Sequence, residues 1–240
     1  MKRIQEPETM DQPGLAPEVH ASALRAVARV NTISLALPQL WRRIRPYLRT
    51  SDRPLRILDL ATGSGAVPIS IARRARRAGL PVEVAGCDFS PFAVKFAREE
   101  AQRCSIAAKF FEWDLVQQGV PEGYDIIVST LFLHHLDPEQ IVDLLRACKE
   151  KARVAVIISD LLRTRRGLLL AQVGPRLLSR NPVVHEDGVR SARAAYTLAE
   201  MRSFTQEAGM EGANIRYSFP ERFLLEWRRT LECGGLPPLS

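Results

Sequence analysis

Residues 57–65 read ILDLATGSG, and this stretch decides the fold. The first four residues are apolar except for Asp59, as expected of a buried parallel strand that ends close to a carboxylate. Gly63 and Gly65 then allow a tight turn, because a backbone without a Cβ can approach a ligand closely. A segment of helical composition follows at residues 66–78. The stretch therefore predicts a strand, a glycine turn and a helix, a unit that binds its ligand at the helix N-terminus beyond the strand ends.

Two common nucleotide-binding patterns do not fit this turn. No Gly-Lys-Ser/Thr follows it, which excludes a phosphate-binding P-loop. The dinucleotide pattern Gly-x-Gly-x-x-Gly would require a third glycine where Pro68 stands.

The turn resembles instead the first motif of the class I S-adenosylmethionine-dependent methyltransferases, which has the pattern Asp-x-Gly-x-Gly-x-Gly. Asp59, Gly63 and Gly65 match this pattern, whereas Ala61 replaces its first glycine. The resemblance extends over about residues 55–229, because the later strands follow the family's order. It implies that the turn, including Thr62, binds S-adenosylmethionine.

Three further apolar runs carry the other motifs that the family would need, and the aspartates of the first three motifs follow one another at spacings of roughly 25 to 30 residues. The first two runs, 82–88 and 108–114, each end in an aspartate, and the third is 124–130. By resemblance, the first aspartate accepts the ribose hydroxyls beside an aromatic face for adenine, and the second accepts the adenine amino group. The third run borders the methionine part of the cofactor. The residues predicted for these contacts are Asp88, Phe89, Asp114, Leu115, Ser129 and Thr130.

The alternation of strands and helices predicts an α/β fold, a Rossmann-like doubly wound sheet of seven strands with an antiparallel C-terminal pair. We expect a polar, extended lead-in over residues 1–20 and an N-terminal helical cap within 1–50 (helices 20–34 and 37–48). A methyltransferase domain would then span 51–230, with a tail at 231–240. The predicted strands are 55–60, 82–88, 108–114, 124–130, 154–160, 209–219 and 221–227, and the helices between them are 66–78, 91–103, 138–151 and 197–208.

Residues 162–196 break this alternation and predict an insertion on the ligand side of the sheet. A helix should begin at Leu168, followed by a loop that Pro175, Asn181-Pro182 and Asp187-Gly188 punctuate. Five arginines surround the insertion. They would favour an acidic acceptor if they face the pocket, and they would indicate nothing about the acceptor if they face solvent. They are Arg163, Arg165, Arg166, Arg176 and Arg180.

Composition limits the remaining possibilities. The 240 residues carry a net charge of +7, mostly from scattered arginines without interleaved aromatics, so nucleic acid is a disfavoured partner. No apolar stretch has the length of a membrane span, and residues 1–7 do not resemble a signal peptide. The four cysteines show no metal-ligand spacing, which predicts reduced thiols, a cytoplasmic protein and no metal site; they are Cys87, Cys104, Cys148 and Cys233.

The segment after the fourth strand narrows the class of acceptor. Residues 129–136 read STLFLHHL and lack the Asn/Asp-Pro-Pro-Tyr/Phe motif of enzymes that methylate amino groups of bases or the glutamine amide of proteins. The segment resembles small-molecule methyltransferases, which implies an O-methyl transfer by in-line displacement to an aromatic or acidic acceptor. His134 and His185 are the candidates for a general base. The alternatives are that His134 only opens the next helix and that His185 is an ordinary loop residue.

Two other functions stay open at this point. The basic charge is compatible with an RNA or protein methyltransferase. A non-catalytic relative that keeps the fold and the cofactor is also compatible with the motifs. The sequence does not indicate the acceptor, the methylated atom, the use of a base or the oligomeric state.

Overall fold

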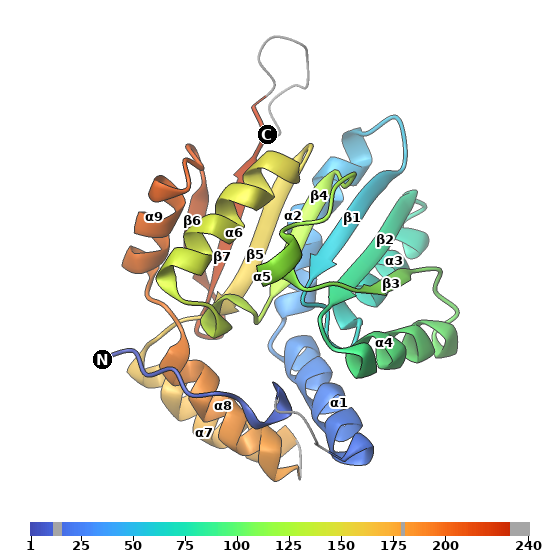
Figure 1. The fold of residues 1–240 in the computed structure, drawn as a ribbon. Helices are drawn as coiled ribbons and strands as arrows, with labels where there is room; N and C mark the ends of the chain where they lie inside the picture. Colours follow the sequence, from blue (N-terminus) through green and yellow to red (C-terminus); the bar gives the residue numbers. More distant parts are fainter. Residues whose placement is uncertain (12–15, 179–180, 231–240) are drawn as a thin grey trace.

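A computed structural model, which describes residues 1–11, 16–178 and 181–230, contains a seven-stranded sheet in the order β3-β2-β1-β4-β5-β7-β6 (Figure 1). Strands β1 to β5 are parallel, and β7 runs antiparallel to both β5 and β6. The predicted doubly wound sheet with its antiparallel pair is confirmed. The strands are β1 Leu55–Leu60, β2 Val82–Asp88, β3 Lys109–Glu112, β4 Ile126–Thr130, β5 Ala155–Leu161, β6 Asn214–Ser218 and β7 Arg222–Arg228.

Alternate side chains of the central strands build a core on each face of the sheet. Ile57 and Ile126 face helices α2 (Ala36–Thr50) and α3 (Ala66–Arg77). Leu58 and Ile127 face the opposite layer. That layer contains α6 (Pro138–Lys151) and α9 (Leu198–Glu207), while α4 (Pro91–Arg103) packs against α3 and β3. The short helix α5 (Leu115–Gln118) follows β3.

A third group of helices lies beyond the carboxyl ends of the parallel strands, below the sheet in Figure 1. It consists of α1 (Pro17–Ile33), α7 (Arg165–Leu178) and α8 (Pro182–Ala194), which contact one another. The N-terminal residues, with a 3-10 turn η1 at Thr9–Asp11, run against α8. A second 3-10 turn, η2 at Leu133–His135, follows β4. The carboxyl edge at the β1/β4 switch point, where such sheets bind ligands, is therefore covered by these segments.

The prediction of a loop is wrong in this covering layer. The loop expected around Asp187-Gly188 is part of α8, because Asn181 caps that helix through the Val183 N–H and Pro182 occupies its first turn. The Asp187 carboxylate does not form a turn but accepts the backbone N–H groups of Thr9 and Met10.

Helix α1 begins at Pro17, inside the segment predicted to be an extended lead-in. Pro175, predicted to lie in a loop, lies within α7. The predicted tail with Cys233, and Arg180, lie outside the described residues.

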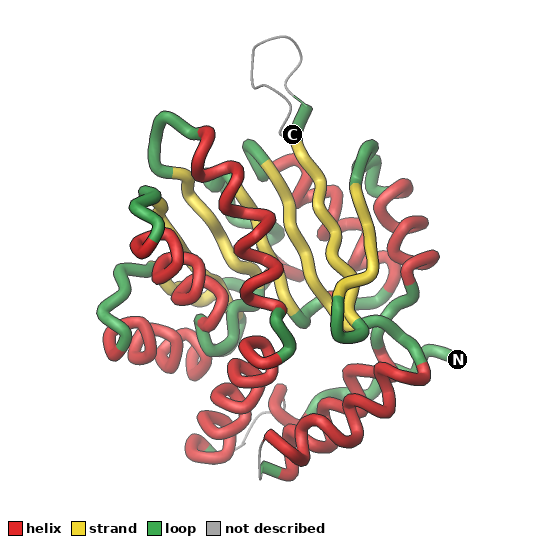
Figure 2. The backbone as a smooth tube through the Cα atoms, turned by 180° about the vertical axis from the view of Figure 1, so that it is seen from behind, coloured by secondary structure: helices red, strands yellow, loops and turns green. Residues whose placement is uncertain are grey.

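Helix α2 is a core element, since Leu40, Trp41 and Ile44 are buried against the sheet face that α3 also covers. Figure 2 shows helices packed on the sheet from this side. Within the residues that the structure describes, no helix is both long enough and apolar enough to cross a membrane.

Gly65 allows the glycine turn to pack closely against α4 and β3, because it has no Cβ. Its φ is +71°, and an added Cβ would lie 2.9 Å from Ala97 Cβ and 2.9 Å from Phe110 Cζ. Gly79, just beyond α3, has a φ of +65° but no atom within 4 Å of such a Cβ. The two glycines share a backbone conformation and differ in crowding.

We expect Gly65→Ala to destabilise the chain about 1–3 kcal/mol more than Gly79→Ala, because only the first adds overpacking to the left-handed backbone strain. Urea unfolding with an unchanged m-value would measure the difference. Equal losses in the two variants would contradict the role assigned to close packing at Gly65.

Candidate functional site

The glycine turn after β1 is held by hydrogen bonds to its two neighbouring strands. Thr62 donates its backbone N–H to the Cys87 carbonyl at 2.9 Å and its hydroxyl to Asp59 Oδ2 at 2.7 Å. Gly86 makes this possible, because a Cβ there would lie 2.5 Å from Thr62 Oγ1. Sequence reasoning did not identify Gly86, although a glycine inside a strand often marks such a close approach.

Asp59 is the buried acid of this turn. Its side chain is 2% exposed, and Oδ1 is one of three buried side-chain polar atoms without a hydrogen-bond partner among the described residues. Burial raises the pKa of Asp59 to about 8, the Thr62 hydroxyl lowers it, and the nearby Asp88 raises it. A cationic donor placed at Oδ1 would satisfy the orphan acceptor and offset the charge.

Ala61 occupies the position where the methyltransferase motif has its first glycine, and its φ is +51°. This left-handed conformation costs an L-residue roughly 1–2 kcal/mol, which gives a physical reason for the glycine in the motif. The chain adopts the same turn despite the substitution.

Asp88 terminates β2 and organises the start of α4. Its Oδ2 accepts the Gly63 N–H at 2.8 Å, and its Oδ1 accepts the Ser90 N–H at 3.0 Å. A carboxylate offers about four acceptor positions, so it can serve more than one donor, as a ribose diol would require. Phe89 beside it is 60% exposed and presents an aromatic surface.

The last predicted cofactor residues lie at the ends of β3 and β4. Asp114 and Leu115 start α5, where Asp114 Oδ1 accepts the Val116 and Gln117 N–H groups and so acts as the N-cap. At the end of β4, Ser129 is fully buried and donates to the Leu60 carbonyl at 3.3 Å, and Thr130 is 9% exposed. The sheet thus brings all the predicted cofactor residues to one carboxyl edge.

His134 lies at the same edge, in η2, within a buried polar cluster. Its Nδ1 is 2.8 Å from Asp160 Oδ1, and its Nε2 is 3.4 Å from Glu8 Oε1. Burial lowers the pKa of His134. The charges and hydrogen bonds of Asp160 and Glu8 outweigh this effect and raise the pKa to about 10. Both ring nitrogens are therefore engaged in this conformation, and a general base would need Glu8 to leave Nε2.

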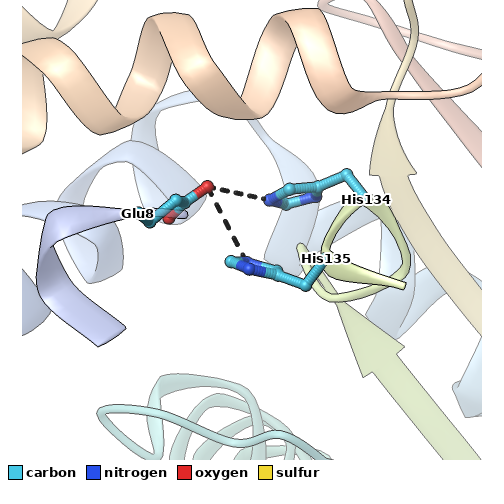
Figure 3. Close-up of side chains that lie close together, drawn as sticks. All are labelled: Glu8, His134 and His135. Carbon is cyan, nitrogen blue, oxygen red and sulfur yellow. Dashed lines mark ion pairs between the residues drawn. The ribbon is translucent and has the colours of Figure 1, made fainter. Parts of the chain in front are cut away.

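Glu8 comes from the N-terminal segment, and sequence reasoning missed it. Figure 3 shows its carboxylate pointing toward the rings of His134 and His135. The Ser191 hydroxyl on α8 also donates to Glu8 Oε1. A glutamate in a polar lead-in gives no signal for such a contact, which depends on how the segment packs across α8.

The N-terminal segment is held to the edge by a further set of contacts. The Arg3 guanidinium lies 4.2 Å from the Tyr196 ring centroid and donates to the carbonyls of Ala194, His134 and Leu136. The segment expected to be a simple lead-in is thus part of the site.

His185 does not share an element with His134, since it stands on the first turn of α8. The residue that the structure brings against the His134 ring is Glu8. Of the arginines around the insertion, Arg165, Arg166 and Arg176 are exposed, which agrees with the solvent-facing alternative. Arg163 pairs with Glu200 at 2.7 Å.

Arg222 is a buried cation at the carboxyl edge that sequence reasoning also missed. It pairs in register with Leu161, the last residue of β5, and is 2% exposed. Its Nη2 donates to Asn31 of α1 at 2.9 Å, whereas Nη1 has no partner among the described residues. Burial lowers the pKa of Arg222 to about 10, and Asp160 opposes this shift. An orphan guanidinium N–H is a donor available to an anion.

A groove of about 400 Å³ lies elsewhere on the chain. It runs from Ser64 along α3, between α1 and α4, and includes arginines of α1 and α3. It is not the site at the strand ends.

The fold and this edge define a class of protein, the doubly wound enzymes that bind an adenosine-type cofactor beside a glycine turn. Residues 57–153 match the family model described as a methyltransferase domain. A demethylmenaquinone methyltransferase from Thermus thermophilus is 36% identical over 92 residues, which are 38% of this chain and 40% of that protein. A ribosomal protein L11 methyltransferase from Brucella suis is 26% identical over 145 residues, 58% of this chain and 47% of that protein.

Among solved structures, magnesium protoporphyrin IX methyltransferase from Synechocystis PCC 6803 with bound S-adenosylhomocysteine superposes with a TM-score of 0.57. It is 20% identical and covers 92% of this chain and 91% of its own, so the likeness shows the fold. The chain therefore carries, over residues 57–153, a domain similar to the class I S-adenosylmethionine-dependent methyltransferases. It spans less than half the length of the curated relatives that it matches.

The buried Asp59 gives a prediction for pH dependence in the absence of cofactor. An unfolded aspartate loses its proton near pH 4, whereas folded Asp59 keeps it to about pH 8. Between these values the folded state binds more protons than the unfolded state, so the contribution of Asp59 to stability falls as pH rises.

We therefore expect Asp59→Asn, which removes this titration, to become progressively more stable relative to the wild type from pH 4 to pH 8. Urea unfolding of both proteins across this range would measure the difference. Asp143→Asn on the exposed side of α6 serves as the control. A difference between Asp59→Asn and wild type that does not vary with pH would contradict the buried titration.

Proposed function

We propose that the chain binds S-adenosylmethionine at the carboxyl edge of β1 to β4 and transfers its methyl group to an oxygen of a small acidic acceptor. The observation that carries the cofactor part is the orphan, buried Oδ1 of Asp59 beside the glycine turn. The methionine part of the cofactor carries an ammonium group, which is the cationic donor that this oxygen lacks. When bound, S-adenosylmethionine supplies an electrophilic methyl group on a sulfonium centre.

The other residues of the edge have distinct roles in this proposal. Asp88 accepts the ribose hydroxyls, and Phe89 covers the adenine. The second oxygen of Asp114 accepts the adenine amino group, with Leu115 alongside. Ser129 and Thr130 border the methionine part. The chain's contribution to rate is then mainly positioning, which can supply roughly 7–11 kcal/mol in a well-oriented displacement.

Two observations support an acidic acceptor. The unpaired Nη1 of the buried Arg222 offers a charge-assisted hydrogen bond to a carboxylate. Both ring nitrogens of His134 are engaged, and an acceptor that is already ionised needs no base. The missing amino-directed motif after β4 supports oxygen rather than nitrogen as the methylated atom.

The arginine-lined groove between α1, α3 and α4 favours the second candidate, an RNA or protein methyltransferase. The groove does not include the strand ends where the methyl group would be transferred. Salt-dependent retention on a polyanion, together with methylation of RNA or protein but not of small acids, would favour this candidate.

Calorimetric titration with S-adenosylmethionine and S-adenosylhomocysteine tests the cofactor assignment. We expect Asp88→Asn to weaken binding of both by about 1–3 kcal/mol, roughly 5- to 150-fold, because the ribose hydroxyls lose acceptors. The matched control Asp143→Asn should bind as the wild type does. Unchanged affinity in Asp88→Asn would overturn the ribose assignment, and absence of binding to the wild type would overturn the cofactor itself.

Methyl transfer to a phenolic carboxylic acid and to its uncharged amide analogue tests the role of Arg222. We expect Arg222→Met to reduce kcat/KM for the acid by roughly 10- to 150-fold, the value of a charge-assisted hydrogen bond. The reduction in kcat/KM for the amide analogue should be much smaller. Arg216→Met, on the neighbouring strand β6, is the control. Equal losses for the two acceptors would show that Arg222 does not select charge.

A further inference from the structure

We propose that Glu8, His134 and His135 form a binding site for one divalent transition-metal ion, with Zn²⁺ as the best match. These are the residues that the structure brings together as a possible ligand set within its described part. The inference does not rest on methyl transfer, because metal binding is measured on the chain itself. The sequence shows no metal-ligand spacing here, since the two histidines are adjacent and the third ligand is in the N-terminal segment.

The distances between the ligand atoms suit one small ion. Glu8 Oε1 is 3.4 Å from His134 Nε2 and 3.8 Å from His135 Nε2, and all three ligand atoms lie within 4.8 Å of one another. Tetrahedral Zn²⁺ with bonds of about 2.0–2.1 Å separates its ligands by roughly 3.3–3.4 Å. Small side-chain adjustments would therefore bring the three atoms to coordination distance.

The surroundings of the ligands are those of a supported metal site. Asp160 binds Nδ1 of His134 at 2.8 Å, which directs Nε2 toward Glu8. Metal-ligating histidines usually have such a partner on the other ring nitrogen. Asp160 is itself fixed by the backbone N–H groups of Phe132 and Leu161, and Ser191 donates to Glu8.

Charge and burial also favour a divalent cation here. Glu8 and Asp160 are 7% and 1% exposed, so two carboxylates are buried around one pair of imidazoles. A divalent ion with two neutral imidazoles would balance both negative charges. The set of two histidines and one glutamate matches a known class of catalytic zinc sites, which keep a fourth position open. The side chain of His135 is 27% exposed and leaves a route for the ion.

The ion would join two distant parts of the chain. His134 and His135 come from η2 directly after β4, whereas Glu8 comes from the segment that crosses α8 (Figure 3). Metal binding would therefore fasten this segment over the carboxyl edge. The ligand set lies at the same edge of the sheet as the proposed methyl transfer.

Equilibrium binding of Zn²⁺ and Co²⁺ to the full, chelator-treated chain tests the proposal. Calorimetry gives stoichiometry and affinity for Zn²⁺, and the visible ligand-field absorption of Co²⁺ reports a nitrogen- and oxygen-bound tetrahedral site. Glu8→Gln and His135→Ala each remove one ligand while leaving the pair of His134 with Asp160 intact. His185→Ala and Glu186→Gln on α8 are the matched controls.

We expect one Zn²⁺ per wild-type chain, a Co²⁺ spectrum of the tetrahedral type, and binding at least roughly 100-fold weaker in both ligand variants, beyond the loss typical of outer-shell changes. The controls should bind as the wild type does. Absence of stoichiometric binding would overturn the proposal, and so would equal affinity in the ligand and control variants. If the wild type binds no metal and Glu8→Gln lowers the melting temperature, the cluster is an ion pair only.

Discussion

The burial of carboxylates at the carboxyl edge of the parallel sheet is the constraint on which the site depends. A carboxylate in such a place must be neutralised or hydrogen-bonded, since an unpaired buried charge is very costly. Asp88 is satisfied by the glycine turn and the start of α4, and Asp160 by the turn after β4 and by His134. Each pairing fixes the loop that supplies the donor. The loops at the switch point are therefore ordered by the same groups that can recognise a ligand.

The covering layer supplies partners for polar side chains at the edge of the sheet. Glu8 reaches the second nitrogen of His134, and Asn31 of α1 accepts from the buried Arg222. Helix α1 also lies over the glycine turn, since a Cβ on Gly63 would be 3.7 Å from Leu24 Cδ2. The N-terminal segment, helix α1 and the sheet edge thus form one site, although they are far apart in the sequence.

The sequence predicts what depends on local pattern. The apolar runs that end in Asp59 and Asp88 place the strands and the predicted cofactor residues, because parallel strands bring their carboxyl ends to one edge. Local pattern also misleads, as at Asp187-Gly188, where turn-forming residues lie in a helix and the carboxylate serves a distant backbone. Glu8 and Arg222 could not be identified, because their roles arise only from long-range packing. The assignment of roles to the predicted site residues stays a prediction.

The charges at the edge fit the reaction that we propose. Asp59 with its orphan oxygen suits a cation, and Arg222 with its orphan N–H suits an anion. The ammonium group of the cofactor and an ionised acceptor are such a pair. Separately, the positive charge of the sulfonium and the negative charge of the acceptor oxygen cancel as the methyl group moves from sulfur to oxygen. A buried, preorganised site favours a step in which charge is lost, because little solvent must reorganise. The same two orphan atoms would be a pure cost to stability in a protein without ligands, so their placement on one edge is best explained by ligand binding.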